Sequence, residues 1–251
     1  MRPVWSSTCI TNLTTMFIDT MSSKELLAEY SSDLPELQAL TERFDQSDYV
    51  SRFLRKRHKA PSAVITKVFT TSRGNRYLGL LFYYRSGYGK NKGWDWSSYH
   101  IGLMNSFKGM CAIAFFDKSN HALKFSPHFF KRYKERFSDL ADWQTRNELM
   151  RARTLSDVIA VYMKRNLSIT WIETKSVFFN KVHIFGPVND GVALLQWDKK
   201  AKVLQANTFV TEDMLNEKQK EMVKYARIYI SLPKAQRKKF QFPDFLLNDT
   251  D

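Results

Sequence analysis

The sequence predicts an α+β fold with a largely antiparallel sheet, a central helix cluster and a helical N-terminal segment. Paired runs of β-branched and aromatic residues predict hairpins, and three consecutive segments in the middle of the chain repeat apolar residues at helical spacing. Of the 251 residues, 43% are hydrophobic, which is enough to build a core of ordinary size. This alternation of hairpins with helix clusters is typical of α+β proteins.

The chain is expected to have three parts. Residues 1–58 form an acidic, helical N-terminal segment, residues 59–230 a basic α+β domain, and residues 231–251 a basic and aromatic C-terminal tail. Residues 1–20 show no clear period, so we expect them to lie outside the folded part, with Met21 as the natural start.

The first helices are expected within residues 23–57, where leucines and aromatic residues recur at helical spacing. Ser22 or Ser23 suits the N-cap, and Pro35 suits the first turn of a second helix. The pattern then changes to strands. Residues 64–69 and 77–84 flank a turn-like Ser-Arg-Gly-Asn and predict a hairpin.

The remaining elements follow from turn residues and helix caps. Glycines and lysines over residues 85–96 predict a flexible basic loop, and Ser126, Ser138 with Asp139, and Thr154 are expected to cap helices. The expected elements are a hairpin of residues 110–116 and 123–125, helices over 127–137, 140–151 and 154–165, strands over 168–173, 181–185, 192–197 and 202–209, and a helix over 211–229 capped by Thr211.

Charge is the strongest functional signal in the sequence. The formal net charge is +14, and because residues 1–51 hold three basic and eight acidic residues, residues 52–251 carry +19. A domain this basic is expected to bind a polyanion, and we expect nucleic acid, with RNA favoured. An acidic partner protein is the second expectation.

Two segments are candidates for nucleic-acid binding. One is the basic run of Arg52, Arg55, Lys56, Arg57 and Lys59. The other is the loop over residues 85–96, where cations and indoles suit backbone contacts and base stacking. Its candidate residues are Lys90, Lys92, Trp94 and Trp96. Each segment also has a purely structural alternative. The basic run could be the solvent-exposed face of a helix, and the tryptophans of the loop could cover the core.

The segment from Ser126 to Phe137 carries the candidate chemistry. His128, Arg132 and Arg136 lie within about 80° of one another at about 100° per residue, and Glu135 shares their face. Aromatic residues occupy the opposite face and are expected to be buried. An imidazole beside two guanidiniums suits attack on a phosphodiester, because the arginines stabilise added negative charge while His128 acts as general base or acid.

Other roles stay open for these residues. Glu135 orients His128 or pairs with Arg132, and charged residues on an amphipathic helix are often only its solvated face. His183, in the strand over residues 181–185, is a candidate second proton carrier or an ordinary sheet histidine.

A helix that opens with His-x3-Arg-x3-Arg, followed by further helices and antiparallel strands, resembles the ribonuclease toxins of the barnase, EndoU, colicin and RelE type. The resemblance covers residues 121–215 and implies a metal-independent, toxin-like endoribonuclease, in which the 2′-hydroxyl attacks the adjacent phosphorus. A toxin of this kind would have an acidic antitoxin as its partner. The resemblance also implies a hydroxyl late in the sheet on the catalytic face, and Thr208 is the candidate. The alternative is a noncatalytic nucleic-acid-binding protein of a mobile element or phage.

Several classes of protein lack support in the sequence. There is no phosphate-binding glycine loop, no dinucleotide fingerprint and no nucleophile elbow, so we expect no cofactor. The histidines and carboxylates lack the spacing of a metal site, so we expect no metal. No apolar run is long enough to span a bilayer, so we expect no membrane partner. Two cysteines in a chain of this length are typical of a cytoplasmic protein, and we expect that location.

Overall fold

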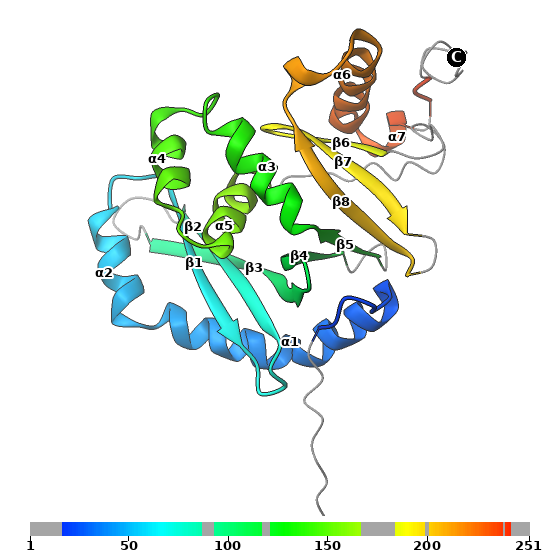
Figure 1. Cartoon of the computed structure of the whole chain (residues 1–251). Helices are drawn as coiled ribbons and strands as arrows, with labels where there is room; N and C mark the ends of the chain where they lie inside the picture. The colour runs from blue at the N-terminus through cyan, green and yellow to red at the C-terminus, as the bar shows by residue number, and fades with distance from the viewer. Residues whose placement is uncertain are drawn as a thin grey trace, which may run out of the picture.

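The computed structural model describes residues 17–86, 93–116, 121–166, 184–198, 201–237 and 239–241 of the chain. These residues form one eight-stranded sheet with helices on both of its faces, and the α+β prediction is confirmed (Figure 1). Within these ranges no helix has both the length and the apolarity needed to cross a bilayer.

The helices and strands alternate in blocks, as expected. The strands are β1 (Ser62–Thr70), β2 (Arg76–Ser86), β3 (Gly93–Ser106), β4 (Gly109–Phe116), β5 (His121–Phe125), β6 (Ile184–Val188), β7 (Gly191–Asp198) and β8 (Val203–Val210). The helices are α1 (Ser23–Asp45), α2 (Asp48–Lys56), α3 (Pro127–Phe137), α4 (Trp143–Arg151), α5 (Leu155–Asn166), α6 (Glu217–Ser231) and α7 (Lys234–Arg237), with a short 3-10 helix η3 (Glu212–Met214).

The strand order is β1-β2-β3-β4-β5-β8-β7-β6. Every neighbouring pair is antiparallel except β5 and β8, which run parallel. Both expected hairpins are present, as the pairs β1/β2 and β4/β5. Two antiparallel meanders therefore meet at a single parallel pair to form one sheet.

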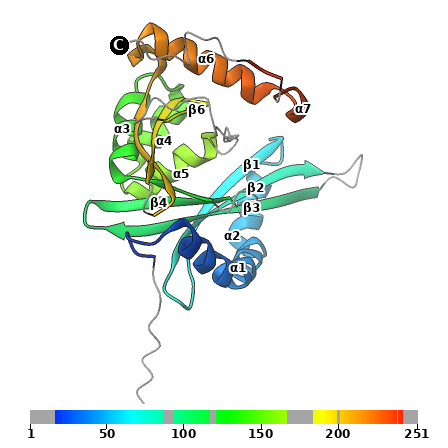
Figure 2. The ribbon, with the colours of Figure 1, turned by 90° about the vertical axis from the view of Figure 1, so that its right-hand side faces the viewer.

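Helices cover the two faces of the sheet in different places. Helices α3, α4 and α5 share a hydrophobic core with one face, whereas α1 and α2 pack on the opposite face of β1 to β4. Figure 2 shows these three layers, with α1 and α2 on one side of the strands and α3 to α5 on the other. A third, smaller core joins α6 to β7 and β8.

Helix α1 is a single helix of 23 residues that contains Pro35, so the expected helix start at Pro35 is wrong. Pro35 removes one backbone hydrogen bond, but contacts with the sheet hold the helix on both sides of it. Leu26 and Leu37 are buried, and the carboxylate of Asp33 accepts a hydrogen bond of 2.7 Å from the hydroxyl of Tyr77. The N-terminal segment is thus a layer of the same folded unit.

Strand β3 replaces the end of the expected flexible loop. Trp94 lies opposite Arg85 and Trp96 opposite Tyr83 on β2. The first half of β3 pairs with β2 alone, since β4 begins to pair with β3 only at Gly102. Glycine and polar residues fill the alternate positions and hide the strand pattern in the sequence, while main-chain pairing with β2 sustains the strand.

Three other expectations need correction or lie outside the described residues. The expected helix 211–229 begins at Glu217, because Asn216 and Gln219 form a reciprocal capping box, whereas the side chain of Thr211 makes no capping bond. The expected strand 181–185 extends to Val188 in its described part, as β6 (Ile184–Val188), an edge strand that tolerates Pro187. The expected strand 168–173 lies outside the described residues.

We expect His100 to make stability depend on pH. His100 is buried, and its Nε2 lies 3.0 Å from the Thr41 hydroxyl on α1. Burial lowers the pKa of His100 from 6.5 to about 4. The unfolded chain therefore binds this proton more readily than the folded chain, so the stabilisation is complete above pH 6.5 and is lost as the pH falls toward 4, by up to about 3 kcal/mol.

Urea unfolding of the wild type and His100→Gln at pH 4 to 7.5 measures this contribution. Glutamine retains a donor for Thr41 and does not titrate, so the wild type should lose more free energy of unfolding than the variant between pH 6.5 and 4. Parallel pH profiles for the two proteins would contradict the assignment.

Candidate nucleic-acid interface

Helix α3 has the cap and the buried face that the sequence predicts. Ser126 is the N-cap, with its hydroxyl accepting from the Phe129 amide, and Pro127 opens the first turn. The apolar face is fully buried and packs against β5, β8 and α5. Its residues are Phe129, Phe130, Tyr133 and Phe137. The polar face of α3 is therefore held firmly in place.

The polar face presents the expected side chains to solvent. His128 is exposed, and Arg132 lies between it and Glu135: its Nε is 3.4 Å from His128 Nε2 and its Nη1 is 2.9 Å from Glu135 Oε2. Arg136 donates to the main-chain carbonyl of Phe209 instead. Burial, and to a smaller extent the charge of Arg132, lowers the pKa of Arg136. Arg136 thus ties α3 to β8 and is less available to a ligand than predicted.

Thr208 lies on the opposite face of the sheet from α3, so the expected catalytic set is not assembled. Phe209, its neighbour on β8, packs under α3, with its ring centroid 5.1 Å from that of Tyr133. Adjacent strand residues point to opposite faces, and Thr208 pairs with Leu194, which packs on the α6 side. Strand alternation therefore does not bring Thr208 to the face of α3 that carries His128. His183 lies outside the described residues.

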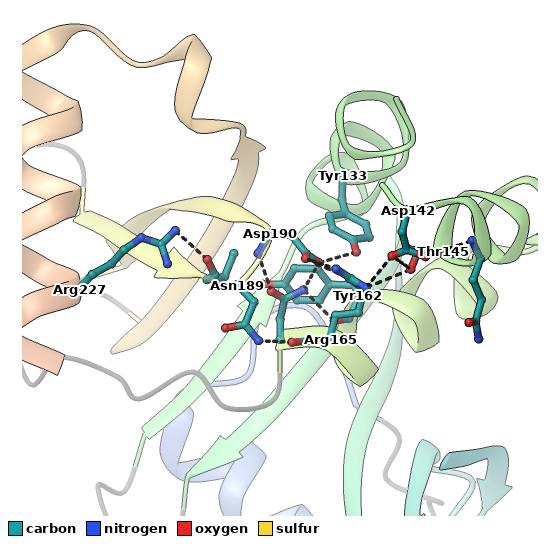
Figure 3. Close-up of polar contacts among 11 residues, drawn as sticks. Tyr133, Asp142, Thr145, Tyr162, Arg165, Asn189, Asp190 and Arg227 are labelled. Carbon is teal, nitrogen blue, oxygen red and sulfur yellow. Dashed lines mark hydrogen bonds and ion pairs between the residues drawn. The ribbon is translucent and has the colours of Figure 1, made fainter. Parts of the chain in front are cut away.

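A buried carboxylate network lies beside α3, between the end of α5 and the β6–β7 turn (Figure 3). The side chain of Asp190 is 2% exposed and pairs with the Arg165 guanidinium, whose Nη2 is 2.9 Å from Asp190 Oδ1. The Tyr133 hydroxyl donates to Asp190 Oδ2 at 2.9 Å, and the Asn166 amide donates at 3.0 Å. Burial, and then the charge of Asp190, raises the pKa of Tyr133.

This network acts as a structural clamp. Arg165 also donates to the Thr145 hydroxyl at 3.0 Å and lies over the ring of Phe137 at 5.1 Å. Each oxygen of Asp190 thus has a donor, and Arg165 links α3, α4, α5 and the β6–β7 turn. Sequence reasoning missed these contacts, because a lone Asp in a turn and an Arg at a helix end carry no pairing signal.

The exposed basic residues gather at another place, around the C-terminal end of α2. We call this group the α2 basic surface; it consists of Arg52, Arg55, Lys56, Arg57, Lys59 and Arg85. Arg85 is half-buried and the other five are exposed. Among the described residues, none of the six has an ion-pair partner, whereas Arg73, Arg165 and Arg227 all pair with carboxylates.

Arg85 joins the α2 basic surface to the sheet. Its Nη2 donates to the main-chain carbonyl of His58, and its guanidinium lies over the Trp94 ring at 4.2 Å. Trp94 and Trp96 are half-buried and pack against the core under α1 and α2. Arg85 covers one face of the Trp94 ring, so this face is not free for the expected base stacking. Lys90 and Lys92 lie outside the described residues.

The two candidate groups lie at opposite ends of β3. Trp94 is near the start of this strand. Pro127 lies against Gly109, the first residue of β4, which pairs with the last residue of β3; a Cβ on Gly109 would be 3.4 Å from that of Pro127. Thirteen residue steps separate the ends of β3, or roughly 43 Å at about 3.3 Å per step. The α3 face and the α2 basic surface are therefore separate sites.

The described residues offer no group of three His, Cys, Asp or Glu side chains that could hold a metal ion. What the α2 basic surface offers chemically is unpaired positive charge and stacked guanidiniums. Of its members, Arg85 was not predicted as a binding residue. Its position at the end of an aromatic strand, opposite a tryptophan, was the signal available.

We expect Asp190→Asn to destabilise the protein by about 3 kcal/mol, because it leaves Arg165 without its buried counter-charge. Urea unfolding at pH 7 measures the change. Asp139→Asn, at an exposed carboxylate near α4, is the control and should change stability by less than about 0.5 kcal/mol. Equal stabilities of the two variants would contradict the clamp.

Comparison with known proteins places the chain in no family: no protein-family model, curated protein or solved structure matches it.

Proposed function

We propose that this protein binds nucleic acid through the α2 basic surface and does so without catalysis. The observation that carries the proposal is the set of six cations at one end of the fold, none of which is neutralised by a described carboxylate. Five of the six are exposed. A surface of this kind attracts a polyanion and gains affinity from the counterions that the polyanion releases.

A purely structural role explains only part of this surface. Cations in the last turn of α2 are stabilised by the negative end of the helix, which accounts for Arg55 and Lys56. Lys59 and Arg85 lie beyond the helix, yet the fold brings them to the same place through the contact between Arg85 and His58. Their convergence from two elements supports a shared ligand.

The ribonuclease hypothesis has less support. It needs His128 to work with a second proton carrier and with phosphate-binding groups on the same face. Thr208 points away from that face, Arg136 bonds to the main chain, and Arg132 pairs with Glu135. What favours the hypothesis is the exposed His128 within reach of Arg132.

Charge removal tests the binding proposal. We expect Arg55→Gln combined with Lys56→Gln to weaken binding of a fluorescent RNA. We also expect the pair to make the negative slope of log affinity against log salt shallower by about 1.5, because two phosphate contacts are lost. The matched control is Arg151→Gln with Arg153→Gln, which removes the same charge at two exposed positions, the last residue of α4 and a residue just beyond it. Equal losses in both pairs would reduce the effect to net charge and overturn the proposed surface.

A cleavage assay separates the proposal from its rival. Incubated with RNA in excess EDTA, the wild type should leave the RNA intact, and His128→Ala should bind as tightly as the wild type. Cleavage that yields 2′,3′-cyclic phosphate ends and disappears in His128→Ala would replace the binding proposal with the ribonuclease hypothesis.

A further inference from the structure

The guanidiniums of two arginines of the α2 basic surface lie over aromatic rings. The guanidinium of Arg57 is 4.6 Å from the centroid of the Phe53 ring, and that of Arg85 is 4.2 Å from the centroid of the Trp94 ring. The other two arginines of the surface bond to their own helix: Arg52 Nε donates to the Asp48 carbonyl and Arg55 Nε to the Ser51 carbonyl.

Stacking on a ring restricts the orientation of a guanidinium. Phe53 and Trp94 are both half-buried against the core under α1 and α2, so the rings are held from behind. Arg85 is further fixed by its bond to the His58 carbonyl and by its main-chain bond of 3.2 Å to Pro61. Both guanidiniums therefore lie over rings whose positions the core fixes.

The two stacks belong to one locality. Arg57 is the C-cap of α2, and the next residue, His58, supplies the carbonyl that Arg85 binds. Two guanidiniums from different elements therefore lie at the same end of the fold. The exposed Lys56 and Lys59 are close to Arg57 in the chain.

A flat cation recognises more than negative charge. An arginine plane stacks on a nucleobase and also binds phosphate through its edge, whereas a lysine ammonium offers only a point charge. The base faces are available in a single strand, but stacked neighbours cover them in a duplex. The indole of Trp94 is covered on one face by Arg85, so the guanidinium takes the position that a free aromatic ring would occupy.

We propose that the ligand of the α2 basic surface is single-stranded nucleic acid, whose unpaired bases stack on the guanidinium planes of Arg57 and Arg85 while the neighbouring lysines bind phosphates. This inference rests on the proposed function and specifies its substrate class. It assigns base contact to the two stacked arginines, and it gives Arg52 and Arg55 a role that depends on charge alone.

Arginine-to-lysine exchange tests the inference because it retains charge and removes the plane. The probes are a fluorescent 12-nucleotide RNA without self-complementarity and a hairpin duplex of the same base composition. We expect Arg57→Lys combined with Arg85→Lys to lose at least about tenfold in affinity for the single strand, since stacking contributes substantially per base. The control, Arg52→Lys combined with Arg55→Lys, should stay within twofold of the wild type, and neither pair should change the affinity for the duplex.

The outcomes separate the inference from the function on which it rests. Equal affinities of the two lysine pairs for the single strand, or a wild-type preference for the duplex, would overturn base stacking while binding at the surface stands. Failure of the wild type to bind either probe at low salt would overturn the proposed function itself. Arg57→Lys alone, at an exposed position, is the second variant in case Arg85→Lys disturbs the β2–β3 pairing, and it should show part of the same selective loss.

Discussion

The parallel pairing of β5 with β8 is the contact on which the rest of the structure depends. It joins the β1 to β5 meander to the β6 to β8 meander, and α3 lies across the junction. Ser126 links the two strands to the helix: its amide donates to the Ala206 carbonyl and its hydroxyl to the Asn207 carbonyl. Phe125 at the end of β5 then packs on Phe129 with ring centroids 5.1 Å apart. The polar face of α3 is rigid because its aromatic face closes this junction.

Charge is used in two different ways in this molecule. Beside the junction, Arg136 binds the Phe209 carbonyl and Arg165 binds Asp190, so both hold elements together, whereas Arg132 pairs with Glu135 within α3. At the far end of β3 the cations of the α2 basic surface have no carboxylate partner among the described residues. Ion pairs within a fold mainly fix the relative positions of its elements, whereas unpaired, exposed charges are available to bind a ligand. This contrast is why the binding proposal rests on α2 and not on α3.

Local signals were sufficient wherever an element has its own cap, period or turn. Helix α3 was predicted to the residue, because Ser126 and Pro127 mark its start and four aromatic residues mark its buried face. The two hairpins followed from alternation and turn residues. Local signals did not predict the elements whose conformation depends on contacts with distant parts of the chain. Helix α1 continues through Pro35 because the sheet holds both of its halves, and β3 is a strand because β2 pairs with it.

The sequence by itself determined the fold class, the basic character of the larger part and the shared face of His128, Arg132 and Glu135, since each depends on composition or on spacing within one element. Only the tertiary structure decided which of these groups meet. Strand alternation turned Thr208 away from α3, the length of β3 separated the two basic groups, and strand pairing placed Arg85 over Trp94 beside the end of α2. Contacts of this kind depend on strand register and on packing between elements far apart in the chain, and local periodicity in the sequence encodes neither.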